Sequence, residues 1–495
     1  MVGYFNHSGG RHSSILMKLR LIIILIWVGL ISLLVARNVF IPEFDTDITT
    51  ALAKAREESF YGIWFQDKRI GYVANRIREA GKGVFSLDQR AHLRLNILNQ
   101  TQQIEMHLKA KLDERQRVQD FTFSFRSPFY SMEARGTVEG RTVSFVTDTG
   151  GTKRKETLVL PETPFISTNH RAYLLNPVPE PGRKVKIPFF DPLSLSGRDT
   201  IVEYVGKEKI LIKKQIHHLH HFESHFSGVR INFWLDENGK VIKEESPAGF
   251  VFLAEPEYKA RDIQDGREDL LRAVAVPYSG HLPPGDTFAK INYRIVVPGD
   301  VELDLDGGRQ QYKEGMLRIT RENIQIVTDP PVGGENCNDP KAILPSRYVQ
   351  SDDPEVTAHA QTIIPDSGDD FQKVKHLASW VYENIDKRPV IGLPDALATL
   401  HSRTGDCNEH AALFAALARG SGIPTRIVAG VTLHQERFYY HAWNEVCIDG
   451  RWMSLDTTKN QIPADLTHIR LVSGDLEEQV RIGALLGKLR IEIVQ

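Results

Sequence analysis

Apolar and polar residues alternate over much of the first half of the chain. The alternation is clear at 91–97 (AHLRLNI) and 104–110 (IEMHLKA), and paired runs flank the turn 66–69 and occur within 231–242. Because successive side chains of a strand point to opposite faces, this pattern predicts an antiparallel sheet with one wet face. We therefore predict a β-rich module over residues 55–276, which docks a substrate or partner or acts as a spacer.

The pattern changes after a Pro- and Gly-rich boundary at 277–285. Strand-like runs return over 286–330, which we predict to be a β-rich connecting segment. A C-terminal domain is predicted over 340–495, where apolar residues between 371 and 385 recur at helical spacing. Its tail is predicted to form closing strands at 468–472 and 489–494. Together with the first module, these elements predict the α+β class.

The N-terminus holds an uncharged apolar run of sixteen residues, from Leu21 to Ala36. As a helix this run is about 24 Å long, short of a ~30 Å hydrocarbon core, and flanking arginines can snorkel to close the gap. Lysine and arginine precede the run, which keeps the N-terminus cytoplasmic. We predict a cytoplasmic stub and transmembrane signal anchor over 1–41, with the bulk of the chain periplasmic or at the cell surface. A cleaved signal peptide is the alternative.

Length, charge and cysteine content narrow the class of protein. At 495 residues the chain is too long for one ordinary domain, so two or three are expected. The formal net charge of −2 gives no support for nucleic-acid binding. Three cysteines are too few for a disulfide framework, although Cys337 and Cys447 could pair in an oxidising compartment.

Five histidines gather in a short segment: His217, His218, His220, His221 and His225. In a strand, His218 and His220 share one face, while His217 and His221 share the other. One face could hold a weak metal or sense pH, but neither a cysteine nor a carboxylate completes a strong site. We therefore predict a solvated strand here, and no metal or cofactor for the chain.

Cys407 stands where a helix is predicted to begin. Asp406 is a suitable N-cap, the run 411–417 is strongly helix-forming, and the glycines of 420–422 end it. A thiol at a helix N-terminus feels the positive end of the helix dipole, which favours the reactive thiolate. Asp406 and Glu409 oppose thiolate formation, so a nearby imidazolium is needed to offset them.

His441 is the residue predicted to supply that imidazolium. The strand-like run that starts at His441 is followed by Asp449-Gly450, a two-residue hairpin signal, and by a returning run. Counting back from this turn pairs Trp443 with Asp456. His441 then shares a face with Trp443 and lies diagonal to Asp456, about 7–8 Å away between backbones, within reach of a hydrogen bond.

Three separated motifs resemble the transglutaminase-like superfamily, whose fold is papain-like. They are Gly405-Asp406-Cys407 at the head of a helix, the run 441–446 (HAWNEV), and Leu455-Asp456, with 422–426 (GIPTR) leading into a strand between the first two. The resemblance covers roughly residues 370–459, and its motifs agree in order and spacing.

The resemblance implies a nucleophile at Cys407, a general base and acid at His441, and an orienting acid at Asp456. It implies a thiol acyltransferase or amide hydrolase that acts on glutamine or peptide amides of a protein or peptide through a thioester. The family's usual tryptophan oxyanion donor has no counterpart that we can assign, because Trp380 falls in a predicted amphipathic helix. A non-catalytic envelope scaffold or binding protein on the same fold is the alternative, since the superfamily includes inactive members.

Overall fold

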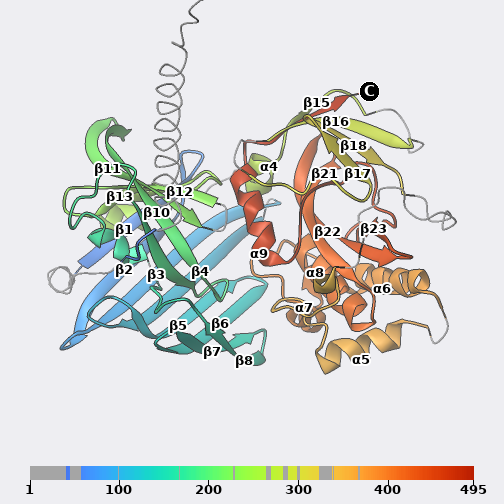
Figure 1. The fold of residues 1–495 in the computed structure, drawn as a ribbon, viewed down its shortest axis with the longest axis horizontal. Coiled ribbons are helices and arrows are strands. Elements are labelled where there is room, and N and C mark those ends of the chain that lie inside the picture. The colour runs from blue at the N-terminus through green and yellow to red at the C-terminus, as the bar shows by residue number, and fades with distance from the viewer. Residues whose placement is uncertain are drawn as a thin grey trace, which may run out of the picture.

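The computed structural model describes residues 41–44, 57–98, 100–166, 168–226, 229–263, 269–282, 288–297, 301–322, 337, 339–365 and 368–494. Two lobes lie side by side (Figure 1). The first consists of long strands from the first half of the chain, and the second holds most of the helices.

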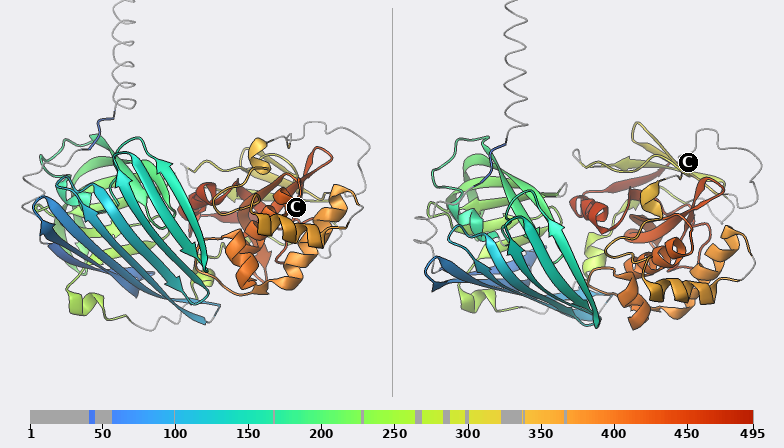
Figure 2. Two further views of the ribbon diagram at one scale, coloured as in Figure 1. Left: turned by 90° about the horizontal axis from the view of Figure 1, so that it is seen from below. Right: turned by 60° about the horizontal axis from the view of Figure 1, so that its bottom comes forward.

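The first lobe is one antiparallel sheet, in the strand order β8-β7-β6-β5-β4-β3-β2-β1-β14-β13-β12-β11-β10-β9. Its strands are β1 Glu57–Phe65, β2 Lys68–Gly81, β3 Val84–Ile97, β4 Gln100–Leu112, β5 Val118–Ser127, β6 Tyr130–Glu139, β7 Thr142–Thr149, β8 Thr152–Val159, β9 Lys184–Asp191, β10 Ser196–Ile212, β11 Gln215–Phe226, β12 Val229–Leu235, β13 Val241–Glu245 and β14 Phe250–Ala254. Figure 2 shows that the sheet is strongly curved. The curvature brings Phe190 of β9 against Phe121 of β5, with ring centroids 5.2 Å apart, so distant strands share one core.

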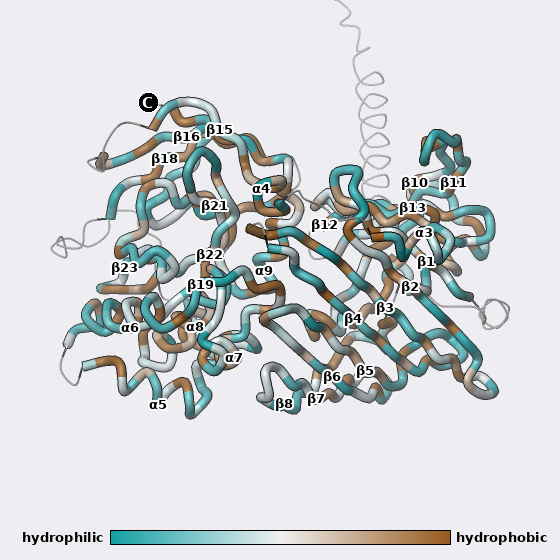
Figure 3. Tube along the Cα trace, turned by 180° about the vertical axis from the view of Figure 1, so that it is seen from behind, coloured by the Kyte–Doolittle hydropathy of each residue, from teal (hydrophilic) through white to brown (hydrophobic). Residues whose placement is uncertain are grey.

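Alternating burial accounts for the long strands of this lobe. Along β4, the buried residues Ile104, Leu108 and Ala110 alternate with exposed ones. Figure 3 shows the same alternation as brown and teal bands along the strands. Burying a large apolar side chain contributes about 1.5–3 kcal/mol, so the inward face holds the sheet together.

Two sheets build the second lobe. One has the order β15-β25-β16-β18-β17, and the other the order β23-β22-β21-β24. Their strands are β15 Tyr278–Ser279, β16 Lys290–Val296, β17 Gln310–Lys313, β18 Met316–Thr320, β21 Thr425–His434, β22 Arg437–Ile448, β23 Arg451–Leu455, β24 Ile469–Ser473 and β25 Arg490–Val494. Phe438 of β22 packs in one core with Tyr293 of β16. The C-terminal strand β25 thus joins the predicted connecting segment to the predicted C-terminal domain.

Helices pack beside the sheet that contains β22. They are α5 Pro354–Ile363, α6 Asp370–Asn384, α7 Ala396–Ser402 and α8 Cys407–Gly420, and the short strands β19 Asp386–Lys387 and β20 Thr404–Gly405 pair next to them. Helix α8 is central, because α5, α6 and α7 all contact it and every residue from Glu409 to Arg419 is buried. The remaining turns are α3 Glu257–Ala260, α4 Leu270–Val274, α9 Leu476–Gln479, η1 Thr168–Tyr173, η2 Pro340–Ala342 and η3 Val480–Leu485.

Strands make up 50% of the structure and helices 18%, so the chain is mainly β and the predicted α+β class is wrong. The sequence patterns understated the strands, because single strands of the first lobe reach 17 residues in β10 and 14 in β2. In the part of the chain that the structure describes, no helix is long and apolar enough to cross a membrane. The transmembrane segment predicted at 21–36 lies outside the described residues.

Candidate active site

Helix α8 begins at Cys407, the position predicted from the sequence. Its N-cap, Asp406, accepts a hydrogen bond from the backbone N–H of Asn408 (2.9 Å), and the Glu409 side chain accepts one from the N–H of Asp406 (2.8 Å). This reciprocal capping box satisfies backbone donors that a helix terminus otherwise leaves unpaired. The turn that carries the thiol is therefore fixed by the capping of a buried helix.

Burial and acidic neighbours set the state of the Cys407 thiol. Burial raises its pKa well above the usual value, the carboxylates of Asp406 and Glu409 add to the rise, and a backbone hydrogen bond from Ala442 opposes it. Burial and these carboxylates therefore oppose the thiolate that a helix dipole alone would favour. Cys407 therefore rests as a neutral thiol and needs a base to become a nucleophile.

The β22–β23 hairpin has the predicted two-residue turn. Asp449 and Gly450 have positive φ angles of 50° and 77°, as a type I′ turn requires, and Ile448 pairs with Arg451 across it. Glycine and aspartate adopt positive φ more readily than most residues. The turn therefore sets the register of the two strands.

The hairpin ladder stops before the predicted pair of Trp443 with Asp456. Asp456 instead forms an isolated bridge with Gln461. The side chain of Asp456 nevertheless contacts His441, with Oδ2 2.8 Å from Nε2. The predicted contact between the two side chains is present, although the predicted backbone pairing is not.

Contacts between α8 and β22 bring the thiol and the imidazole to neighbouring positions. Ala442, the residue after His441, donates its backbone N–H to the sulfur of Cys407. Asn444 donates from Nδ2 to the backbone carbonyl of Ala411 in α8 (3.0 Å). The three residues predicted to form the site thus lie at the start of α8, on β22 and just after β23.

The pKa values of His441 and Asp456 are also shifted from their usual values. Burial lowers the pKa of His441, while its hydrogen bond to Asp456 opposes that shift. Burial alone would raise the pKa of Asp456, but hydrogen bonds from His441 and His468 hold it well below the usual range. The site therefore combines a neutral thiol, a neutral imidazole and an ionised carboxylate, which is the state a general base requires.

His468 belongs to the site but was not identified from the sequence. It is fully buried just before β24, with Nε2 3.0 Å from Oδ2 of Asp456 and Nδ1 3.0 Å from Oδ1 of Asp465. The sequence indicated only a closing strand at 468–472, because no motif surrounds this histidine. Its position depends on the pairing of β24 with β21, a long-range contact that local spacing does not reveal.

Among the described residues, His441, Asp456 and His468 have ligand atoms that lie within 4.8 Å of one another and could hold a metal ion. Both histidines, however, contact the same Asp456 oxygen at hydrogen-bonding distances of 2.8 and 3.0 Å. A metal ion would have to displace both hydrogen bonds. We therefore interpret the group as a hydrogen-bonded network.

The five histidines noted in the sequence lie on β11, in the first lobe. His220 is buried with Nδ1 2.8 Å from the hydroxyl of Tyr204, and His221 stacks on Trp234 with ring centroids 4.8 Å apart. A solvated strand therefore describes His218, which is exposed, but not His220.

Cys337 and Cys447 form a disulfide, with Cα atoms 5.7 Å apart. This was one of the alternatives that the sequence left open. Cys407 is consequently the free cysteine of the described chain, and it is half-buried. A thiol reagent that reaches the folded oxidised protein therefore reports on Cys407.

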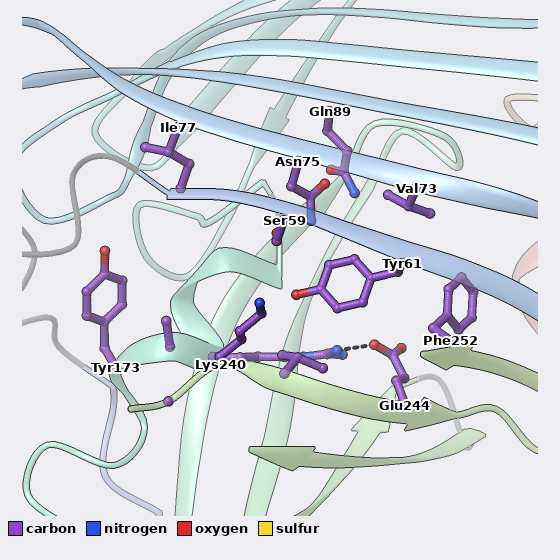
Figure 4. Close-up of a pocket in the computed structure, with 14 residues that line it drawn as sticks. Ser59, Tyr61, Val73, Asn75, Ile77, Gln89, Tyr173, Lys240, Glu244 and Phe252 are labelled. Carbon is purple, nitrogen blue, oxygen red and sulfur yellow. Dashed lines mark hydrogen bonds and ion pairs between the residues drawn. The ribbon is translucent and has the colours of Figure 1, made fainter. Parts of the chain in front are cut away.

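Two cavities lie away from these residues. One of about 180 Å³ is in the first lobe, where Tyr61, Asn75 and Gln89 line it (Figure 4). Arg171 and Glu244 form an ion pair in its wall. A crevice of about 810 Å³ includes residues of both lobes. Neither cavity is lined by Cys407, His441 or Asp456, so neither indicates where a substrate meets the thiol.

Comparisons with known proteins give a family match and distant structural likenesses. Residues 357–457 match the model of the transglutaminase-like superfamily. No curated protein matches the chain.

Three solved structures are similar over parts of the chain. A proposed cysteine protease from Cytophaga hutchinsonii is 20% identical, with a TM-score of 0.28 over 44% of this chain and 81% of its own. A β-barrel-like protein of unknown function from Brucella abortus is 13% identical, with a TM-score of 0.31 over 40% and 94%. A proposed protease from Parabacteroides distasonis is 11% identical, with a TM-score of 0.21 over 70% and 66%. All three TM-scores are below 0.5.

Proposed function

We propose that this chain, which carries a transglutaminase-like domain at residues 357–457, is a cysteine enzyme. Its proposed substrates are glutamine or peptide amides. In this proposal Cys407 is the nucleophile, His441 the general base and acid, and Asp456 the residue that orients the imidazole. The observation that supports the proposal most is the 2.8 Å contact between His441 Nε2 and Asp456 Oδ2. The residue that follows His441, Ala442, donates its backbone N–H to the Cys407 sulfur.

The two ring nitrogens of His441 have different roles in this reaction. Nε2 donates to Asp456, which leaves Nδ1 as the nitrogen that can accept a proton from Cys407. As the sulfur attacks the amide carbonyl carbon, the proton moves to Nδ1, and the Asp456 carboxylate stabilises the imidazolium. The carbon–nitrogen bond then breaks, His441 returns the proton to the leaving nitrogen, and a thioester remains on Cys407.

The second half of the reaction decides the class of enzyme. Attack of water on the thioester, with His441 taking its proton, gives an amidase or peptidase. Attack of an amine by the same route gives an acyltransferase. Both routes release the free thiol and need the same three side chains.

A binding role without chemistry is the second candidate. The raised pKa of the Cys407 thiol favours it, because a thiol that stays protonated is a weak nucleophile. The two candidates differ in one consequence: only the enzyme forms a covalent acyl adduct on Cys407.

That adduct provides the test. The purified full-length protein is incubated with a pool of glutamine-containing peptides, with and without a fluorescent primary amine, and quenched in acid for mass spectrometry. We expect an acyl adduct on Cys407, with release of ammonia or a peptide fragment, and neither in Cys407→Ala. Folded wild-type protein that forms no adduct and no product with the pool would favour the binding role.

We also propose that the protein folds outside the cytoplasm, in the periplasm or at the cell surface. The Cys337–Cys447 disulfide supports this, because structural disulfides persist mainly in oxidising compartments. Alkylation of cell extracts under denaturing conditions, before and after reduction, tests it. Two additional reactive thiols after reduction are expected, whereas three free thiols before reduction would contradict the proposal.

A further inference from the structure

Asp456 accepts four hydrogen bonds in a buried position. Oδ1 accepts from the backbone N–H groups of Thr458 (2.8 Å) and Lys459 (3.2 Å). Oδ2 is shared by His441 Nε2 (2.8 Å) and His468 Nε2 (3.0 Å). One carboxylate oxygen therefore holds two imidazoles, of which the mechanism above uses only one.

Both ring nitrogens of His468 face carboxylate oxygens. Nε2 faces the carboxylate of Asp456 and Nδ1 faces that of Asp465. Burial alone would raise the pKa of both carboxylates. Hydrogen bonds from histidine side chains instead hold the pKa of each well below the usual range. Ionised carboxylates only accept, so each of these two contacts requires the facing ring nitrogen of His468 to donate.

Two residues of the segment 286–330 hold the loop that carries His468. Arg309 is buried and donates from Nη2 to the backbone carbonyls of Asp465 (2.9 Å) and His468 (3.0 Å). The hydroxyl of Tyr293 donates to the carbonyl of Leu466 (2.8 Å). These three contacts hold the loop before β24 and keep the ring of His468 beside Asp456.

Resting on the proposed function, we propose that His468 donates from both ring nitrogens as a cation, and that it is a positioning residue that fixes the Asp456 carboxylate and limits how strongly His441 holds a proton. A cation beside Oδ2 makes this oxygen a weaker acceptor for the hydrogen bond from His441. It also repels a protonated His441. His441 therefore stays a neutral base at rest and readily returns its proton to the leaving group. The site is a tetrad of Cys407, His441, Asp456 and His468.

Other groups near His441 act together with His468. Lys459, after β23, also opposes the protonation of His441, and its Nζ donates to Thr432 Oγ1 (2.8 Å). The thiol of Cys407 on α8 is neutral in the resting state. Asp456 favours protonation of His441, and His468, which contacts the same carboxylate oxygen, opposes it.

The test replaces His468 with glutamine, which keeps an N–H donor but has no charge. The titration of His441 is followed by NMR on the full-length protein with ¹³C-labelled histidine, and its signal is assigned with His441→Gln. In His468→Gln we expect the pH midpoint of His441 to rise by about one unit, a tenfold gain in proton affinity. The control His376→Gln changes an exposed histidine on α6 and should leave the midpoint unchanged. An unchanged midpoint in folded His468→Gln would overturn the proposal.

The wild-type protein gives a second readout if His468→Gln fails to fold. ¹⁵N NMR of the histidine rings should show both nitrogens of His468 protonated between about pH 5 and 8. A single ring proton in that range would overturn the proposal. Because neither measurement needs a substrate, loss of the proposed enzyme activity and loss of this charge effect are separate results.

Discussion

Asn444 of β22 donates a hydrogen bond of 3.0 Å from Nδ2 to the backbone carbonyl of Ala411 in α8. Asn444 lies three residues after His441, and Ala411 lies four residues after Cys407. The bond is fully buried, so water does not compete for either group. It therefore ties the strand that carries His441 to the helix that carries Cys407.

Replacing Asn444 with alanine should lower the free energy of unfolding by about 1–3 kcal/mol, because a buried hydrogen bond and packed volume are both lost. Urea unfolding measures this change. Asn384→Ala is a matched control, since Asn384 makes the same kind of bond to the carbonyl of Trp380 (2.9 Å) in an exposed position. The control should stay within about 0.5 kcal/mol of wild type. Equal losses in the two variants would contradict the role given to burial.

The raised pKa of the Cys407 thiol predicts slow alkylation near neutral pH. The rate with iodoacetamide should rise only as the pH exceeds the usual thiol value of about 8.5. Asp406→Asn keeps an N-cap residue but removes a negative charge next to the sulfur, so its midpoint should fall below that of the wild type. Asp369→Asn makes the same change at the exposed N-cap of α6 and should have no effect. Fast labelling of the wild type at pH 6 would show that the helix dipole outweighs desolvation.

Local signals predicted the parts of the site that local structure determines. The start of α8 follows from Asp406 and the alanine-rich run, and the turn at Asp449-Gly450 follows from residues that accept positive φ. The pairing of Trp443 with Asp456 was wrong, because Asp456 leaves the ladder and its N–H bonds to the carbonyl of Gln461 (2.9 Å).

The remaining features depend on long-range contacts. His468 reaches Asp456 only because β24 returns beside β21, and Arg309 holds its loop from a segment more than a hundred residues earlier. Alternation identified strands in the first lobe, but it carries no information on how fourteen of them curve into one sheet. The class of the fold was therefore the less predictable part.

Asp456 should link the stability of the protein to pH. Its pKa is lowered by folding, so its contribution is present above the unfolded value of about 3.9 and is lost as the pH falls below it. Asp456→Asn should therefore cost about 3–5 kcal/mol near pH 7, because His468 loses a buried partner. The difference from wild type should shrink below about pH 4. Thermal unfolding across this pH range measures both.

An exposed aspartate serves as the control for that measurement. Asp370 pairs with Lys373 on the surface of α6 (2.8 Å), and Asp370→Asn should cost less than about 1 kcal/mol at any pH. A difference between Asp456→Asn and wild type that stayed constant from pH 7 to pH 3 would mean that the carboxylate charge is not what stabilises the site.

The Cys337–Cys447 disulfide should stabilise the second lobe, because it joins β22 to a residue 110 positions earlier. Closing a loop of this length restricts the unfolded chain and contributes about 2–5 kcal/mol. Cys337 is buried with Ala342 and Trp452, and Cys447 packs against the same apolar cluster, so the covalent bond lies inside a packed core. In a Cys407→Ser background, which prevents thiol exchange, a phosphine reductant should lower the melting temperature by several degrees. The double variant Cys337→Ser with Cys447→Ser should melt at the lower temperature with or without the reductant. Equal melting temperatures for the oxidised and reduced protein would mean that packing around Trp452, and not the covalent bond, holds β22 in place.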